Sequence, residues 1–393
     1  NTGWMNGDIK LATLSDTDDT NVTGAELVTN GTFASGTTGW TFDAAATDTS
    51  TAGFLSGTTG AGTNRLANQV ITTVIGKAYR VETTTGPAST SVYVGTSDGS
   101  IANGSTGFAT SASKSLTFIA TTATTYLSVM GVGASVSVSL GNITVRLAEE
   151  DRSVNGNGLQ VFGTITKTAV ETGADLVAYS GFSASNYLEQ PYNADLDFGT
   201  GDFSVMGWVK STTTGLRIVL SKAPASSTAS PYFELQQQTD GTIDWVGVTG
   251  SRVGSGSSVT DGSWNLIAFV KAEGVGYFYT NGKLSESKAN TDNYTHSAGD
   301  TLRLGYRQDG YAGTYGGSLA LLRISGTAPT AEQIAKIYND EKVLFQENAQ
   351  ATLYGTSDAV TALAHDDSTD LLHVGTSAGR SVFQGLRRVE NTT

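Results

Sequence analysis

The sequence predicts an all-β chain that folds into two jelly-roll β-sandwiches in series. Short apolar runs rich in Val, Ile, Tyr and Phe recur between clusters of Gly, Ser, Thr and Asn, which is the pattern of strands and turns. The 48 glycines and a charged fraction of only 15% indicate many turns. At 393 residues the chain exceeds the size at which one hydrophobic core stops growing, so we expect more than one domain.

The strand-like runs form two groups, each the size of one sandwich. We expect the first domain at 25–148, from the run that contains Leu27 to the run that contains Leu147, and the second at 175–345. The intervening stretch 149–174 begins with acidic and glycine residues that have little to bury. We therefore interpret it as a linker.

The two ends of the chain, 1–24 and 346–393, are expected to be β segments. Residues 4–14 have the pattern of one strand, and further strand-like runs follow Thr352. Short isolated strands leave backbone groups unpaired and cannot bury a face alone. We therefore expect the two ends to pair with each other in a propeller-like sheet, or with another chain in an intersubunit sheet.

One segment has the signature of a helix. Thr330 precedes Gln333 by three positions, as in a capping box, and Ile334, Ile337 and Tyr338 share one helical face. This helix is expected to close the second sandwich.

The charge balance excludes two classes of partner. A formal net charge of -13, with no cluster of Lys and Arg to override it, repels nucleic acid and anionic membranes. No apolar run approaches the roughly 20 residues of a membrane helix. The absence of cysteine from the sequence excludes disulfides and thiolate sites. We expect neither nucleic-acid binding nor membrane insertion.

The second predicted domain resembles the laminin-G-like, concanavalin A-like jelly-roll superfamily. The resemblance is carried by the motifs at 201–210, 261–268, 279–283, 302–305, 321–324 and 328–334, in the order of the family. Within them, Asn281-Gly282 is a favoured hairpin pair. The family's usual histidine pair is replaced by Asn265-Leu266, and Ala320 stands where an acidic residue is usual. The resemblance therefore implies the scaffold without its calcium site.

The first predicted domain is similar to carbohydrate-binding modules of the galactose-binding-like jelly-roll type. The similarity lies in the opening motifs at 26–33 and 38–41 and in the closing motif at 142–145, although Gly141 replaces the usual acidic residue. The order of the modules resembles virion proteins of tailed bacteriophages. The end piece at 360–385 resembles a β-propeller blade.

We expect no catalysis. Two Gly-x-Ser-x-Gly patterns, at 95–99 and 375–379, match a nucleophile elbow, but an elbow needs a helix after the serine. A strand-like run follows the second pattern, so hairpin turns are the prediction at both. The alternating carboxylates that a glucanase places on one strand are missing from the sequence.

No cofactor is expected. Calcium is the alternative left open by the acidic loops at Asp16, Asp18 and Asp19, and at Asp195 and Asp197, which lack the glycine and distal glutamate of an EF-hand loop. We favour solvated loops for both. His365 and His373, near three aspartates, are likewise interpreted as surface residues and not as metal ligands.

The best candidate for ligand binding is the loop at 305–315. It offers Tyr306, Arg307, Asp309 and Tyr311, a mixture that can stack on a sugar face and hydrogen-bond its hydroxyls. Trp245 is a further candidate. The alternative is that Tyr306 and Tyr315 pack beneath the loop.

These features favour a noncatalytic structural or adhesion protein of a virion, located at its surface or tail. Its partners would be host cell-surface glycans and other virion proteins, and we expect a homo-oligomer. The alternative is an extracellular protein, a noncatalytic carbohydrate-binding region of a secreted bacterial glycan-active or cell-surface protein.

Overall fold

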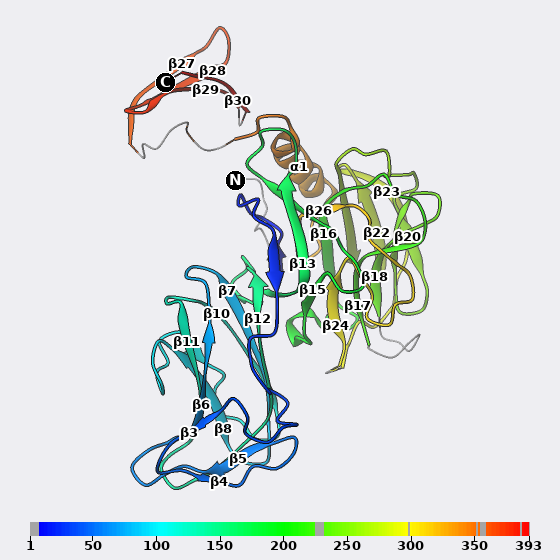
Figure 1. Cartoon of the computed structure of the whole chain (residues 1–393). Helices are drawn as coiled ribbons and strands as arrows, with labels where there is room; N and C mark the ends of the chain where they lie inside the picture. The colour runs from blue at the N-terminus through cyan, green and yellow to red at the C-terminus, as the bar shows by residue number, and fades with distance from the viewer. Residues whose placement is uncertain are drawn as a thin grey trace. The chain divides into compact units, whose positions relative to one another are not determined.

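The structure is a computed structural model that describes residues 8–224, 232–297, 299–350, 353, 359–385 and 387–392 (Figure 1). It divides into two units, which we describe separately. The first sandwich comprises Thr23–Asp151 with Gly156–Gly163, and the second unit comprises Asn1–Val22, Arg152–Asn155 and Thr164–Thr393. The short strand β2 spans Val22–Gly24. Both units are built from β-sheets, as the sequence predicts.

The first sandwich has two five-stranded sheets. One sheet has the order β4-β5-β12-β7-β10, with bounds Thr47–Asp48, Leu55–Thr58, Ser137–Glu149, Ala78–Thr85 and Ser113–Ile119. The other has the order β3-β6-β11-β8-β9, with bounds Thr41–Phe42, Arg65–Thr72, Thr124–Gly131, Thr90–Gly95 and Gly104–Ser105. Neighbouring strands in both sheets are antiparallel.

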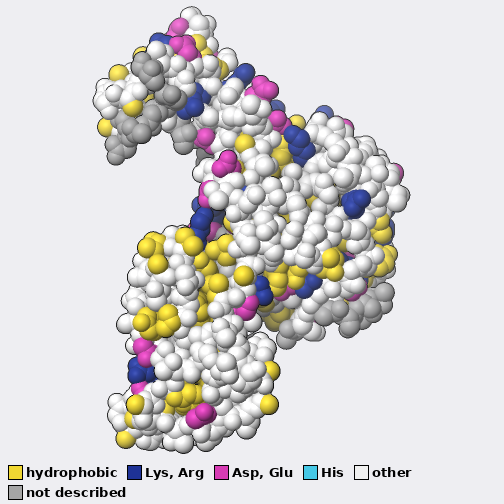
Figure 2. Space-filling model, viewed as in Figure 1, with side chains coloured by type: hydrophobic (Ala, Val, Ile, Leu, Met, Phe, Trp, Pro, Cys, Tyr) yellow, Lys and Arg dark blue, Asp and Glu magenta, His cyan; other side chains and the backbone are white. Residues whose placement is uncertain are grey.

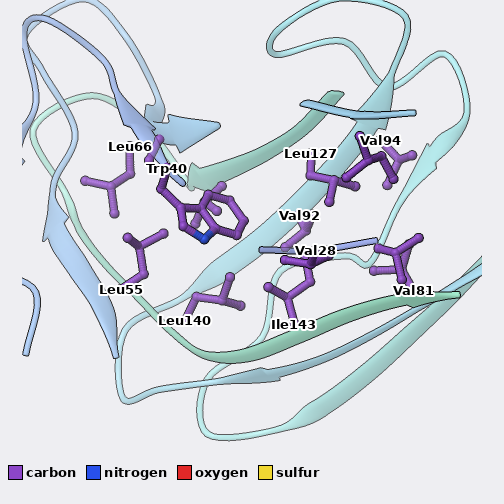
Figure 3. Packing of buried hydrophobic residues seen from close by; sticks show 14 of the residues in the cluster. Val28, Trp40, Leu55, Leu66, Val81, Val92, Val94, Leu127, Leu140 and Ile143 are labelled. Atoms are coloured by element: carbon purple, nitrogen blue, oxygen red, sulfur yellow. The ribbon is translucent and has the colours of Figure 1, made fainter. Parts of the chain in front are cut away.

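The two sheets of the first sandwich enclose one apolar core. Side chains from both sheets converge in it, as Figure 3 shows for Leu127 and Val92 of one sheet and Leu140 and Ile143 of the other. Trp40 lies in this core beside Phe33, with ring centroids 5.6 Å apart. Successive side chains of a strand point to opposite faces of its sheet, and one face is buried in this core. The apolar residues therefore alternate with polar ones along each strand.

The opening and closing motifs of the first sandwich bind each other. The Glu26 carboxylate accepts hydrogen bonds from the backbone N–H groups of Val28 and Val145, at 3.0 and 2.8 Å. The backbone of Leu27 donates to the carbonyl of Val145, and the buried Gln69 side chain bonds the backbone of Thr29 and Gly39. These bonds fix the two motifs that carry the carbohydrate-binding-module resemblance.

The second unit contains a larger sandwich of two sheets. The helix-side sheet has the order β23-β22-β21-β16-β26-β1, with bounds Lys283–Ala289, Val275–Thr280, Asn265–Ala272, Phe203–Lys210, Ser318–Ser325 and Ile9–Thr13. Strand β26 also pairs with β14 (Val177–Ser180), and β14 pairs in turn with β13 (Leu159–Ala169). The loop-side sheet has the order β15-β24-β17-β18-β19-β20, with bounds Tyr187–Gln190, Thr301–Leu304, Arg217–Ala223, Phe233–Gln237, Ile243–Val246 and Arg252–Gly254.

An aromatic cluster fills the space between these two sheets. The Trp245 ring stacks on Phe269 with centroids 4.1 Å apart, and Phe203 packs against both. The Trp245 indole N–H donates to the Tyr294 hydroxyl at 3.1 Å, so its one polar group is satisfied inside the core. Stacked rings of this kind bury large apolar areas and dominate the stability of a sandwich.

A helix covers the outer face of the helix-side sheet. Helix α1 (Ala331–Glu341) begins with the predicted capping box of Thr330 and Gln333, and Ile334 and Ile337 pack on Met206 and Trp208. The short 3-10 helix η2 (Lys342–Phe345) follows it, and η1 (Ala194–Leu196) lies earlier in the chain. Strand β16 is therefore covered on both faces, as its nearly unbroken burial requires.

A buried ion pair locks the helix to the sheet. The Glu341 carboxylate lies 2.8 Å from the Arg323 guanidinium and accepts a 2.8 Å hydrogen bond from the Trp208 indole. Burial raises the pKa of Glu341, and the nearby Arg323 charge opposes this effect.

The hairpin turn predicted at Asn281-Gly282 is present. Both residues have positive φ, 52° and 78°, as a type I′ turn requires.

The N-terminal strand has a different partner from the one the sequence suggested. Strand β1 pairs antiparallel with β26 in the sandwich, not with the C-terminal strands. Ile9, Leu11 and Leu14 are buried there, because an apolar strand is stabilised most by a sheet with a core behind it. Residues 4–7 of the predicted strand, including Trp4, lie outside the described residues.

The predicted linker also contains a strand that the sequence analysis did not anticipate. Strand β13 runs from Leu159 to Ala169, and Leu159, Val161 and Ile165 are fully buried. Within the stretch, Asp151 is buried and accepts a hydrogen bond from the Asn157 backbone N–H. The acidic residues of this stretch predict a solvated linker, but a backbone N–H of the following turn binds the buried Asp151 carboxylate.

The C-terminal residues form a sheet of their own. Its four antiparallel strands, in the order β27-β28-β29-β30, span Val360–Asp366, Leu371–Thr376, Gly379–Gln384 and Arg387–Thr392. A propeller blade also has four antiparallel strands, and the blade itself stays a prediction.

The surface agrees with the low charged fraction. On the face in view in Figure 2, charged side chains are scattered and most of the surface is neither charged nor hydrophobic. Among the described residues, the helices are too short and too polar to span a membrane.

The Arg323–Glu341 pair yields a stability prediction. Glu341→Ala leaves Arg323 buried without its counter-charge, so we expect a loss of about 3–5 kcal/mol in the free energy of unfolding, measured by urea denaturation. The exposed Glu332→Ala on the same helix is the matched control, with an expected loss below about 1 kcal/mol. The double variant Arg323→Met/Glu341→Leu should recover most of the loss. If Glu341→Ala and Glu332→Ala lost the same free energy of unfolding, the proposed role of the Arg323–Glu341 pair would be wrong.

Candidate binding site

The outer face of the loop-side sheet is polar at β18, β19 and β20. Along β18, Phe233 and Leu235 point to the aromatic core, so Glu234 and Gln236 point away from it. Strand pairing places Val246 opposite Glu234 and Asp244 opposite Gln236, and Arg252 on β20 opposite Val246. This patch of carboxylate, amide and guanidinium groups is the floor of the site.

The loop 305–311 covers this floor. It leaves β24 at Gly305, whose φ is +79° and where any β-carbon would collide with the Phe182 ring. The Gly305 N–H donates to the carbonyl of Val219, and the Tyr315 N–H donates back to the Gly305 carbonyl. Only glycine fits this junction, which directs the loop across the sheet.

Arg307 joins the loop to the floor. Its guanidinium is 4% exposed, pairs with the Glu234 carboxylate and lies 3.0 Å from the Asp309 carboxylate. It also lies over two tyrosine rings, 5.1 Å from the centroid of Tyr232 and 4.8 Å from that of Tyr311. The cation is thus held by two carboxylates and two π-faces, which compensates its removal from water.

A small cavity opens beside this cluster. Its volume is about 120 Å³, and it is lined by Tyr232, Glu234, Gln236, Val246, Arg252, Arg307 and Tyr311. Arg252 donates to the Gln236 side-chain oxygen at 2.9 Å and lies 3.7 Å from Asp244. The polar lining is therefore ordered by its own hydrogen bonds before any ligand arrives.

The charges around the cavity nearly cancel. The carboxylates of Glu234, Asp244 and Asp309 face the guanidinium groups of Arg252 and Arg307. Burial raises the pKa of Glu234, and Arg307 opposes this effect. Burial likewise raises the pKa of Asp244, with Arg252 in opposition. A site of this kind has hydrogen-bonding groups without a large net charge.

Two of the five predicted site residues, Arg307 and Tyr311, line the cavity, and Asp309 contacts both of them. Tyr311 is 55% exposed, Arg307 lies over its ring, and the Asp309 carboxylate accepts a hydrogen bond from the Tyr311 backbone N–H at 3.0 Å. Tyr306 lies apart, with its ring 5.6 Å from Tyr187 and beside Arg303. Tyr315 is buried, as the alternative interpretation of the loop required.

Trp245 is a correction to the sequence analysis. It has no exposed surface and stacks within the aromatic core, so it cannot contact a ligand at the surface. The sequence around position 245 is ambiguous, because Asp244 is polar and Val246 is apolar. The stacking of Trp245 on Phe269 between the two sheets shows that Trp245 lies on the inner face of β19. Sequence reasoning missed Tyr232, Glu234, Gln236 and Arg252, although the alternation along β18 was a usable signal.

The acidic loops do not converge on a calcium site. The Asp197 carboxylate pairs with the Lys222 ammonium at 2.8 Å and accepts a 2.6 Å hydrogen bond from Tyr192. Asp16 pairs with the buried Lys167. A lysine thus stands where a cation would have to bind. Within the described part of the chain, no group of three or more His, Asp or Glu residues is arranged to hold a metal.

The two serine patterns occupy turns. The segment 95–99 leads from β8 into the antiparallel β9, and 375–379 joins β28 to β29, so both patterns lie in hairpins as predicted. His365 is exposed near the end of β27, with its ring nitrogens 2.9 and 3.3 Å from Asp367 and Asp370.

A larger cavity in the second unit has a different character. Its volume is about 380 Å³, and its apolar surface comes mainly from Leu176, Leu321, Leu344 and Ala349. Asp16 on its rim is engaged by Lys167 and by two backbone N–H groups. Its described lining contains no aromatic side chain, whereas Tyr232 and Tyr311 line the smaller site.

Comparison with known proteins agrees with the fold. Residues 182–335 match the family model described as the concanavalin A-like lectin/glucanases superfamily. The predicted jelly-roll resemblance in this region is thereby confirmed. No curated protein matches the chain.

Several solved structures are similar at low identity. The binding domain of Paraclostridial Mosquitocidal Protein 1 has 11% identity and a TM-score of 0.41, with coverage of 62% of this chain and 70% of that one. Domain 4 of AbnA, a GH43 extracellular arabinanase from Geobacillus stearothermophilus solved with arabinotriose, has 19% identity and a TM-score of 0.39, covering 48% and 92%. The receptor binding domain of a botulinum neurotoxin C/D mosaic serotype has 12% identity and a TM-score of 0.40, covering 62% and 61%.

The Lys222–Asp197 cluster yields a prediction on pH. His296 is buried beside Lys222, Asp300 and Asp197, and burial with the Lys222 charge lowers its pKa to about 4. Because the folded pKa lies below that of the unfolded chain, near 6.5, the unfolded state binds the proton first as pH falls. Stability should therefore be lost between about pH 6.5 and pH 4, on the order of 3 kcal/mol from this group.

The measurement is the free energy of unfolding of the parent and of His296→Gln across this pH range. The difference between the two proteins should shrink as pH falls, since only the parent carries the titrating imidazole. The neighbouring exposed Asn293→Ala serves as control and should follow the parent. A difference that stays constant from pH 7 to pH 4 would contradict the assignment.

Proposed function

We propose that the second unit is a noncatalytic glycan-binding module, and that its site is the cavity beneath Tyr311. The observation that carries the proposal is the combination of one exposed aromatic ring with a prearranged polar floor. Tyr311 is 55% exposed, and Gln236 and Arg252 lie in the same cavity. Sugars offer an apolar C–H face and a rim of hydroxyls, so a ring beside amide and charged groups matches both.

The geometry assigns a role to each residue. Arg307 lies over one face of the Tyr311 ring, which leaves the opposite face for a sugar. Because Arg307 is already paired with Glu234 and Asp309, it positions the ring and is not itself the main contact. Gln236 and Arg252 are the groups that would hydrogen-bond hydroxyls. We therefore propose Arg307 and Asp309 as positioning residues and not as the main polar contacts of the sugar.

The charge balance favours neutral sugars over acidic ones. The guanidinium groups at the cavity face carboxylates, and the chain carries a net charge of -13 that repels anions at longer range. A carboxylate on the ligand would have to compete with Glu234, Asp244 or Asp309 for the arginines. Neutral hexoses need no such exchange.

We also propose a setting for the protein, at the surface or tail of a virion, where the modules contact host glycans or other virion proteins. This rests on the resemblance in module order, which is an analogy between folds. Immunoelectron microscopy of the native source distinguishes it from the extracellular alternative, because labelled particles are expected only in the first case.

Tyr311→Ala tests the proposed site. On an array of neutral oligosaccharides, we expect the variant to lose ten-fold or more in affinity for any glycan that the parent binds, since an aromatic platform contributes about 1.4 kcal/mol or more. Its melting temperature should stay near that of the parent, because the ring is exposed. Tyr126→Ala, in the first sandwich, is the matched control. Equal binding by parent and Tyr311→Ala would place the site elsewhere.

The absence of catalysis is a separate prediction. Incubation with polysaccharides and ester substrates should release no product from the parent, and Ser97→Ala and Ser377→Ala should behave identically. Both serines lie in hairpins, without the strand–helix junction that activates a nucleophile. Turnover that either substitution abolishes would overturn the noncatalytic assignment.

A further inference from the structure

The C-terminal sheet has one edge that differs from the rest of the molecule. Among the described residues, β27 pairs with β28 and with no other strand. Leu363 is 67% exposed and Val360 is 54% exposed, while Val374, Val382 and Phe383 on the inner strands are buried. An exposed apolar edge strand is a template for pairing with another strand.

The two edges of this sheet are not equivalent. Strand β30 carries Arg387, Arg388 and Glu390, and its outer side is partly occupied, because the Arg388 N–H donates to the Asn348 carbonyl. Charges on an edge strand prevent pairing with further strands. Residues 359–365 contain no Lys, Arg, Asp or Glu. Charged residues occur at several positions of β30, but on β27 they are limited to Asp366 at its end.

From this contrast we propose that β27 is a self-association edge, where it pairs antiparallel with β27 of a second copy of this chain. This proposal does not depend on glycan binding.

The composition of β27 permits pairing with a second copy in one register. Two chains of net charge -13 repel each other over most of their surfaces, so a contact between copies needs a segment without carboxylates, such as 359–365. With the two-fold axis at Leu363, Leu363 faces its own counterpart and Ala362 faces Ala364 of the second copy. Asp366 then faces Val360. A shift of the axis to Asp366 would oppose two carboxylates, which is unfavourable.

The expected interface is small. Seven residues from each copy form the pair, so the buried area falls in the class of weak, transient contacts. Pairing supplies backbone hydrogen bonds on the open edge and brings the two Leu363 side chains together across the axis. Such a two-fold contact is isologous and closes on itself, which limits the assembly to a dimer through this edge.

The natural absence of cysteine permits a direct test. Directly opposed residues of an antiparallel pair have Cα atoms about 4.5–5.5 Å apart, within the range that a disulfide spans. Under mild oxidation of the full chain, Leu363→Cys should form a covalent dimer. Val360→Cys alone should not, but a mixture of Val360→Cys and Asp366→Cys should form the heterodimer. Val360 and Leu363 are exposed, whereas Asp366 is half-buried and accepts two hydrogen bonds from Ser368. The melting temperature of each variant therefore verifies that it is folded before crosslinking is compared.

Sedimentation without crosslinking gives an independent readout. The weight-average mass of the parent should rise with concentration, Leu363→Lys should abolish the rise, and the matched edge control Val389→Lys should retain it. Absence of both the Leu363→Cys dimer and the concentration dependence would overturn the proposal. Equal crosslinking by Leu363→Cys and Val360→Cys would also overturn the proposal, because it indicates random collision. Loss of association in Val389→Lys alone would overturn it as well, because that result assigns the association to β30.

Discussion

Every sheet has two faces and two edges, and the way each is covered determines most of this structure. In the helix-side sheet, α1 covers the outer face and β1 extends one edge at β26. In the loop-side sheet, no helix lies over the patch around Glu234, and the loop at 305–311 covers it instead. The candidate site exists because a loop covers a sheet less completely than a helix does.

Three buried cations of the second unit each pair with a carboxylate. Lys222 meets Asp197, Arg323 meets Glu341, and Arg307 meets Glu234. Pairs of this kind contribute little net stability compared with apolar residues, but breaking one is costly, so they fix a unique arrangement of the elements they join. The first joins η1 to β17, the second joins α1 to the sheet, and the third joins the loop to β18.

The third pair links packing to the proposed function. Arg307 is needed to compensate the buried Glu234 charge, and the same guanidinium lies beneath the Tyr311 ring. The exposed ring is therefore held by a buried interaction, which reduces the entropy that a ligand would have to remove. At Lys222 and Lys167 the buried cation is instead paired with an aspartate of an acidic loop, Asp197 or Asp16.

The sequence alone determined the features that depend on neighbours along the chain. Alternation of apolar residues identified the strands, the Thr330–Gln333 spacing identified the helix, and Asn281-Gly282 identified a hairpin. It also located the loop of Arg307, Asp309 and Tyr311. Each of these signals arises from local backbone geometry or from side chains one or two turns apart, so a linear pattern contains it.

Only the tertiary structure decided which partner each strand takes and which side of a strand faces water. Trp245 and Glu234 lie on neighbouring strands with similar local patterns, yet one is in the core and the other beneath the loop. Strand β1 joins β26, more than 300 positions away in the chain, and Arg307 finds Glu234 across β17. Pairing of this kind depends on the free energy gained when apolar faces that are distant in the chain leave water together. A local sequence pattern contains no information on which distant faces will meet.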